Sequence, residues 1–229
     1  MAVDTDDLKR RGWRQTAVSL PIFAALLFVP VGTLRYWQGW LYAFVFIAGC
    51  VVIGVYFTKH DPALIERRMK IGPAKEREPA QKIIVTLALI GFLLLFVGSG
   101  LDVRWHWSSV PAWLAIVANG MIGVAFAVFF VVLKQNSYAA STITVEPGQP
   151  VISTGVYGLV RHPMYAGALL LVVFTPPALG SYWALLVTVA FLPALAWRLL
   201  DEERVLRRDL PGYADYCRAV RYRRVPGLW

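Results

Sequence analysis

Two short segments in the C-terminal half of the chain carry most of the side chains that could do chemistry. In the first, Tyr157, His162 and Tyr165 lie close together, and Pro163 follows the histidine. Proline suits the first turn of a helix, where free backbone N–H groups can face a bound anionic group. A single histidine at a helix start is more often only a hydrogen-bonded polar residue. The aromatic and polar neighbours nevertheless favour a binding site for a zwitterionic or carboxylate-bearing cofactor.

In the second segment, Arg198 and Glu202 are four residues apart and share a helix face. An exposed ion pair at this spacing would add only about 0.3 kcal/mol of stability. Here, however, three consecutive acidic residues end an apolar stretch beside an anionic membrane surface, which a purely structural helix does not require. We therefore predict a functional role for Arg198 and Glu202. The other charged residues are interpreted as surface groups facing lipid headgroups: Glu203, Arg204, Arg207 and Arg208.

The elements that position these residues are apolar helices. Of the 229 residues, 58% are hydrophobic and 16% are charged, which is typical of a membrane protein. Four blocks are near the length of about 20 residues that crosses a bilayer, and two are shorter. The predicted fold is an all-α, multi-pass membrane bundle of about six helices. The blocks are Thr16–Leu34, Trp37–Phe57, Ile83–Leu101, Val110–Leu133, Met164–Leu179 and Tyr182–Trp197.

The last two blocks are predicted to form a tight hairpin, because little more than Gly180 and Ser181 separates them. The hairpin either crosses the membrane or is re-entrant, and in both cases the chain returns to the side where it began. His162 is thereby expected to face Arg198 and the acidic residues after it. An amphipathic helix continues to Leu210, where Pro211 and Gly212 end it, and a second short helix follows.

Basic residues predict the orientation, because they collect in short cytoplasmic loops. With these spans, 21 of the 23 Lys and Arg fall on one side, and only Arg35 and Arg104 fall on the other. Both termini are expected to be cytoplasmic, in the inner membrane of a prokaryote or the endoplasmic reticulum of a eukaryote. The net charge of +9 is explained by basic loops that pair with anionic lipid headgroups, and no nucleic-acid partner is expected. Neither a disulfide nor a metal site is predicted, because the cysteines and histidines are scattered.

Two regions are distinguished within one membrane domain. Residues 1–133 hold four spans, and residues 134–229 hold a loop, the hairpin and the C-terminal helices. The Pro-containing segment 59–82 is expected to be loosely ordered.

Three sequence elements in order resemble the isoprenylcysteine carboxyl methyltransferase family. They are G-V-Y-G-L-V-R-H-P-M-Y-A-G (155–167), R-L-L-D-E-E-R-V-L (198–206) and Y-A-D-Y-C-R-A-V (213–220). The phospholipid N-methyltransferases share the R-H-P and E-E elements, and the resemblance covers about residues 135–226. It implies S-adenosylmethionine as the cofactor. It also implies a lipophilic or lipidated substrate that enters from the surrounding membrane lipids.

The resemblance also implies roles for individual residues. Arg198 would meet a substrate carboxylate, and Glu202 would pair with the cofactor ammonium group. Arg198, Glu202 and His162 form the expected catalytic group. The loop before R-H-P matches the family loosely, but Asn136 and Gln149 are in place. The expected cofactor-binding residues are Thr142, Gln149, Pro150, Val151, Ile152, Tyr157, His162, Pro163, Met164, Tyr165 and Glu202.

Several functions fit these residues. Carboxyl O-methylation of an isoprenylcysteine-like substrate is favoured, because a carboxylate needs no base and Arg198 could orient it by two parallel hydrogen bonds. A phospholipid amine or a thiol would have to lose a proton, and His162 is the nearby side chain suited to accept it. An NADPH-dependent reductase of the sterol reductase type is a further alternative, because its C-terminal region shares an acidic helix and the ending R-R-V-P-G-L-W (223–229). The last alternative is a membrane protein that keeps the motif but has no enzyme activity.

Overall fold

The computed structural model describes residues 5–69, 72–76 and 78–223. Every regular element in these residues is helical, which confirms the all-α prediction. The helices are α1 (Thr5–Phe28), α2 (Trp37–His60), α3 (Pro62–Met69), η1 (Pro73–Lys75), α4 (Pro79–Trp105), α5 (Ala112–Gln135), α6 (Val156–Leu159), α7 (Pro163–Ala178), α8 (Ala184–Asp209) and α9 (Tyr213–Ala219).

Four of these helices are long and apolar enough to cross a membrane, namely α2, α4, α5 and α8. The chain is therefore an integral membrane protein. Crossing by α1 and α7 stays a prediction, since α1 begins with a charged segment and α7 has only 16 residues. The first helix also differs from the predicted block, because it begins at Thr5 and ends at Phe28. Pro30, which lacks an amide hydrogen, and the positive φ of Gly32 end it.

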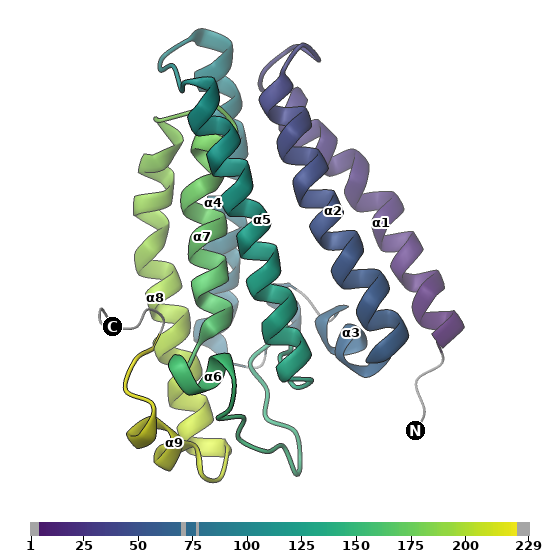
Figure 1. Cartoon of the computed structure of the whole chain (residues 1–229), viewed down its shortest axis with the longest axis vertical. Helices are drawn as coiled ribbons and strands as arrows, with labels where there is room; N and C mark the ends of the chain where they lie inside the picture. The colour runs from purple at the N-terminus through teal and green to yellow at the C-terminus, as the bar shows by residue number, and fades with distance from the viewer. Residues whose placement is uncertain (1–4, 70–71, 77, 224–229) are drawn as a thin grey trace.

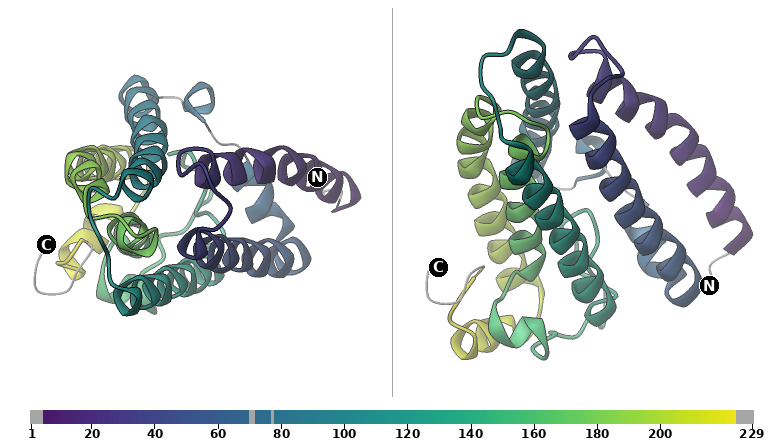
Figure 2. Two further views of the ribbon diagram at one scale, coloured as in Figure 1. Left: turned by 90° about the horizontal axis from the view of Figure 1, so that it is seen from above. Right: turned by 45° about the horizontal axis from the view of Figure 1, so that its top comes forward.

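Long helices α4, α5, α7 and α8 pack together, and α1 and α2 form a pair beside them (Figure 1). Figure 2 shows the same arrangement from above and tilted. Helices α5 and α7 approach closely at Gly167, where a Cβ atom would lie 2.6 Å from the ring of Phe129. The α1–α2 pair joins the bundle through the Tyr36 hydroxyl, which donates to the carbonyl of Leu179, and through Tyr42 and Thr175 (3.0 Å).

Asp102, which is fully buried, ties the two connections at one end of the bundle together. Its carboxylate accepts hydrogen bonds from Ser108 Oγ (2.6 Å) in the α4–α5 connection and from Ser181 Oγ (2.5 Å) in the α7–α8 turn. The backbone amide groups of Ser108 and Trp183 donate to it as well. The α7–α8 hairpin is thus closed by a turn that is anchored on α4.

The opposite end carries α3, α6, α9 and the start of α1 (Figure 1). This end bears most of the basic segments, whereas Arg35 and Arg104 lie in or beside the connections at the other end. The segment expected to be loosely ordered contains α3 and η1 in its described part, and Leu64 in α3 is fully buried against Phe57 and Leu133. For this described part the expectation was wrong, because apolar residues of α3 pack against α2 and α5; residues 70, 71 and 77 lie outside the described residues.

Candidate functional site

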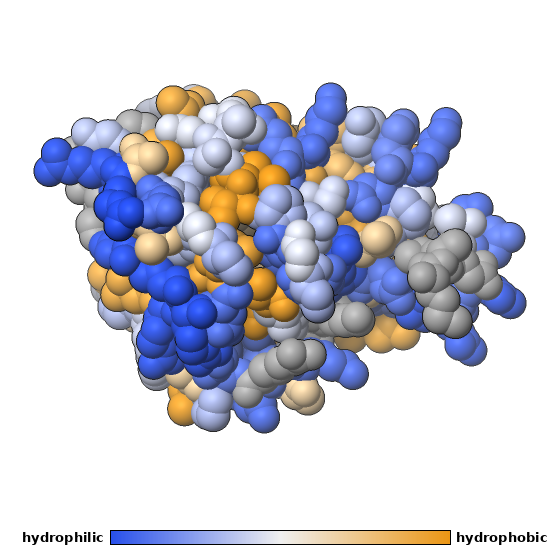
Figure 3. Space-filling view, turned by 90° about the horizontal axis from the view of Figure 1, so that it is seen from below, coloured by the Kyte–Doolittle hydropathy of each residue, from blue (hydrophilic) through white to orange (hydrophobic). Residues whose placement is uncertain are grey.

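A cavity of about 660 Å³ lies between α4, α7, α8 and the connection from α5 to α6. Viewed from below, this end of the molecule is largely hydrophilic, with apolar residues visible in its middle (Figure 3). One part of the cavity is polar and the other is apolar. The apolar part is lined from α4, α7 and α8 by Val85, Ala88, Leu89, Phe92, Leu95, Val172, Val187, Phe191 and Leu195.

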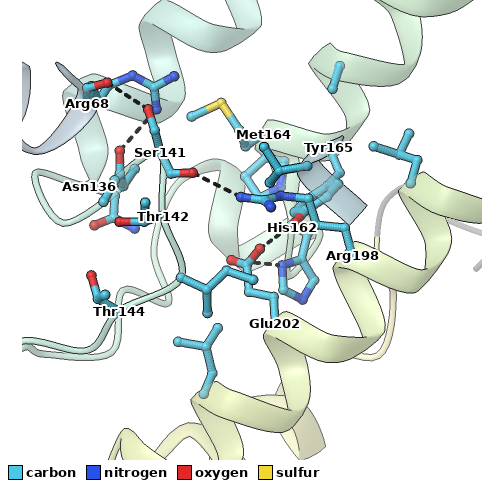
Figure 4. A pocket seen from close by; sticks show the side chains of 18 of the residues that line it. Arg68, Asn136, Ser141, Thr142, Thr144, His162, Met164, Tyr165, Arg198 and Glu202 are labelled. Carbon is cyan, nitrogen blue, oxygen red and sulfur yellow. Dashed lines mark hydrogen bonds and ion pairs between the residues drawn. The ribbon is translucent and has the colours of Figure 1, made fainter. Parts of the chain in front are cut away.

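All of the site residues expected from the sequence line this one cavity. Figure 4 shows several of them from close by, contributed by α7, α8 and the α5–α6 connection. The structure therefore brings these residues together, and the role of each residue stays a prediction. The residues are Thr142, Gln149, Pro150, Val151, Ile152, Tyr157, His162, Pro163, Met164, Tyr165, Arg198 and Glu202.

The short helix α6 is held against the end of α5. Gly155 precedes it with a φ of 59°, and a Cβ atom there would lie 2.5 Å from the Gln135 side chain. Gln135 Oε1 accepts a hydrogen bond from Val156 N, and Asn136 Nδ2 donates to the Tyr157 hydroxyl (both 3.0 Å). Burial is the main reason that the pKa of Tyr157 is raised to about 12. The Tyr157 hydroxyl therefore stays protonated at neutral pH.

The turn that carries Arg161 and His162 is paired with the segment after α9. The backbone N–H of Arg161 donates to the Tyr222 carbonyl (2.9 Å), and that of His162 donates to the Arg223 carbonyl (2.8 Å). Arg161 Nη1 also reaches the Cys217 carbonyl (3.3 Å). The position of the histidine thus depends on residues about 60 positions later.

His162 lies between two carboxylates. Its Nε2 atom is 3.3 Å from Glu203 Oε1, and its Nδ1 atom is 4.0 Å from Glu202 Oε1. Tyr213 contributes a hydroxyl 3.3 Å from Nε2. The Tyr165 hydroxyl donates to Glu202 Oε2 at 2.6 Å. A proton on Nε2 would satisfy Glu203 and leave Nδ1 on the side of Glu202 (Figure 4).

The surface interpretation of Glu203 was wrong. Glu203 is only 4% exposed, and it forms ion pairs with Arg161 Nε (2.8 Å) and Arg223 Nε (3.1 Å) in addition to its contact with His162. A buried carboxylate requires such partners, because an unpaired charge in an apolar environment is costly. Of the two adjacent glutamates, Glu203 therefore holds the R-H-P turn in place, while Glu202 lines the cavity.

Arg198 has partners from two distant parts of the chain. Its Nη1 atom donates to Glu76 Oε1 (3.3 Å) and Gln81 Oε1 (2.9 Å), and its Nη2 atom donates to the same Glu76 oxygen (3.3 Å) and to the Ser141 carbonyl (2.9 Å). Glu76 and Gln81 were missed by the sequence interpretation. Their only signal was polarity directly before an apolar helix, in a segment expected to be loosely ordered.

The connection from α5 to α6 is fastened to α3. Arg67 binds both carboxylate oxygens of Glu146 (2.8 and 3.1 Å), and Arg68 Nη1 donates to the Ala139 carbonyl (3.1 Å). Ser141 Oγ donates in return to the Arg68 carbonyl (2.9 Å). These contacts place the segment that carries Thr142 and the residues from Gln149 to Ile152 over the polar part of the cavity.

Comparison with known proteins bears on this region. The model of the isoprenylcysteine carboxyl methyltransferase (ICMT) family matches residues 114–208. The family resemblance is therefore confirmed. The ICMT match runs from α5 through the R-H-P turn and the hairpin to the acidic end of α8, and it supports a membrane methyltransferase in general. Glu76 and Gln81 lie outside the region that the ICMT model matches.

A curated relative matches more of the chain. The cobalt-zinc-cadmium resistance protein CzcN of Cupriavidus metallidurans is 29% identical over 163 residues, which are 69% of this chain and 67% of the relative.

Proposed function

We propose that this protein is an S-adenosylmethionine-dependent methyltransferase that acts on the polar head of a lipophilic acceptor. The observation that carries the proposal is the joint lining of one cavity by the residues of the R-H-P and E-E elements and by apolar side chains of α4, α7 and α8. A polar cofactor and an apolar acceptor could thus meet in one site. The family match supports the reaction class.

The polar part of the cavity fits the cofactor. The volume of the whole cavity, about 660 Å³, lies within the usual range of about 300–1,000 Å³ for small-molecule sites. Glu202 offers a carboxylate for the ammonium group of the cofactor. The segment from Gln149 to Ile152 offers backbone groups and apolar side chains for its adenine base. Bound S-adenosylmethionine would supply a methyl group on a positively charged sulfur, which keeps the electron pair of the broken carbon–sulfur bond.

The residues of this chain then have mainly to position the acceptor. Transfer requires the attacking atom to lie about 3 to 3.5 Å from the methyl carbon and in line with the breaking bond. The apolar part of the cavity would hold the acceptor's tail, and its head would lie near Arg198 and Tyr165, where the lining becomes polar.

Two classes of acceptor follow. The family resemblance favours carboxyl O-methylation of an isoprenylcysteine-like acceptor, in which a carboxylate oxygen attacks without a base and Arg198 orients the carboxylate. The second class comprises lipophilic amines and thiols, whose proton His162 would accept. This class is favoured by the contacts of Arg198, because both of its Nη atoms are bound by other protein groups.

The test has a binding part and a transfer part. The purified protein should bind S-adenosylmethionine in calorimetry, and Glu202→Gln and His162→Ala should each weaken binding by roughly tenfold to a hundredfold, as expected for a lost charged contact. Asp215→Asn is the matched control, because Asp215 is exposed and pairs with Arg218 of its own helix, away from the cavity lining. Membranes containing the protein should transfer labelled methyl groups into a lipid-soluble product. Absence of both cofactor binding and transfer would disprove the proposal.

A further inference from the structure

Glu76 holds the guanidinium of Arg198 at the boundary between the polar and apolar parts of the cavity. The Glu76 residue is 5% exposed, and one of its carboxylate oxygens accepts hydrogen bonds from both Nη atoms. Its other oxygen accepts from the backbone N–H of Ile143 (3.3 Å). Both oxygens are thus bound, and both residues line the cavity.

Gln81 completes the arrangement. Its side chain is fully buried, its Nε2 atom donates to Asp201, and its Oε1 atom accepts from Arg198. With the Ser141 carbonyl, four hydrogen bonds engage the Nη atoms of Arg198, which carry four hydrogens. A carboxylate that bound Arg198 by two parallel hydrogen bonds would have to displace at least one of these groups.

A carboxylate in this place would also meet a like charge. Glu76 already neutralises Arg198, and Coulomb repulsion between two carboxylates is strong in a cavity lined largely by apolar side chains. Removal of Glu76 from Arg198 would leave a buried carboxylate without its charged partner, which is costly. The arrangement therefore disfavours an acceptor whose head carries a carboxylate.

From these contacts we propose that Glu76 is a specificity-determining residue, which occupies Arg198 and thereby selects acceptors whose head group has no carboxylate. The inference rests on the proposed function and specifies its acceptor as a lipophilic amine or thiol. In the transfer, the nitrogen or sulfur lone pair forms the bond to the methyl carbon, and the sulfonium sulfur keeps the electrons of the broken bond. The acceptor proton passes to His162.

Two ligands that carry the same farnesyl tail test this selection by binding measurements alone. Farnesylthioacetate carries a carboxylate, and farnesylthioacetamide carries a neutral head of nearly the same shape. The wild-type protein should bind the amide more tightly than the acid by about tenfold or more, the size expected for like charges brought together. In Glu76→Gln, which keeps the size of the side chain and removes its charge, this preference should be lost or reversed.

Glu78→Gln is the matched control. Glu78 lies two residues away and also pairs with an arginine of α8, Arg208 (2.9 Å), but it does not line the cavity. It should leave the preference unchanged. Binding of S-adenosylhomocysteine to each variant shows that the site is folded. If Glu76→Gln does not fold, the preference of the wild-type protein for the amide over the acid tests the proposal by itself.

Tighter binding of the acid by the wild-type protein, or an unchanged ratio in a folded Glu76→Gln variant, would overturn the proposal. Labelled methyl transfer to farnesylamine or farnesyl thiol, measured beside transfer to farnesylthioacetate, tests the acceptor class in the reaction itself. Preferential labelling of the acid would also overturn it. Failure of this proposal can be distinguished from failure of the proposed methyltransferase activity. The ratio of amide to acid binding is measured without methyl transfer, whereas loss of both cofactor binding and transfer would concern only the methyltransferase activity.

Discussion

The Tyr165 hydroxyl on α7 donates a hydrogen bond of 2.6 Å to Glu202 Oε2 on α8. This contact joins the two helices of the hairpin at the polar part of the cavity. It also orients the carboxylate that is proposed to bind the cofactor ammonium group, since one oxygen is directed to the tyrosine.

Tyr165→Phe removes this hydrogen bond and leaves the ring in place. We expect the affinity for S-adenosylmethionine to fall by about threefold to tenfold, because Glu202 loses a partner that fixes its rotamer. Calorimetry on the purified protein measures the change. Tyr182→Phe, at the exposed tyrosine of the α7–α8 turn, should bind like wild type. An unchanged affinity in Tyr165→Phe would show that this hydrogen bond does not support cofactor binding.

Arg198→Lys keeps the charge but cannot reproduce the planar fork that binds Glu76, Gln81 and the Ser141 carbonyl at once. Methyl transfer should fall by roughly tenfold to a hundredfold, while cofactor affinity stays near wild type. Arg198→Ala should lower transfer as well, and it should also destabilise the fold because it leaves the buried Glu76 without its charged partner. The exposed Arg207→Lys serves as the control. Equal loss of cofactor affinity and turnover would instead place Arg198 in the cofactor site, and full activity of both variants would show that its contacts with Glu76 and Gln81 are not needed for transfer.

Glu203→Ala should destabilise the fold strongly. The substitution leaves the buried Arg161 without its carboxylate, and breaking a buried ion pair in this way costs about 3–5 kcal/mol. Thermal unfolding in detergent should show a clearly lower midpoint. Asp215→Ala breaks the exposed pair with Arg218 and should change stability by about 1 kcal/mol or less. Equal stability of the two variants would contradict the buried role of Glu203.

The distribution of basic residues predicts that both termini are cytoplasmic. Reporter domains fused before Met1 and after Trp229 should both be protected from proteases added outside intact cells or spheroplasts. The wild-type chain is sufficient for this test, because cytoplasmic termini and external termini would give opposite results. Protease access to either reporter would refute the prediction.

The sequence was sufficient to predict that the R-H-P turn and the acidic segment of α8 meet, because a hairpin returns the chain to the side where it began. His162 and Glu202 could therefore be placed together from spacing alone. The partners of Arg198 could not, since Glu76 and Gln81 lie more than a hundred residues earlier and reach it only through the packing of α4 against α8. Local rules link Arg198 to Glu202 four residues on, whereas its ion pair is with Glu76.

The misinterpretation of Glu203 has a similar physical origin. Adjacent residues on a helix point in different directions, so Glu202 and Glu203 cannot share one environment. Which of the two faces the cavity depends on where the segment after α9 lies, and that segment supplies Arg223. Composition and helical spacing contain no information on this contact.

The backbone pairing of Arg161 and His162 with Tyr222 and Arg223 has a consequence for biosynthesis. The ribosome makes the histidine long before it makes the residues that hold it, so the R-H-P turn cannot take its final position while α7 and α8 are being inserted. The proposed site is therefore complete only after the segment after α9 has left the ribosome and docked against the R-H-P turn.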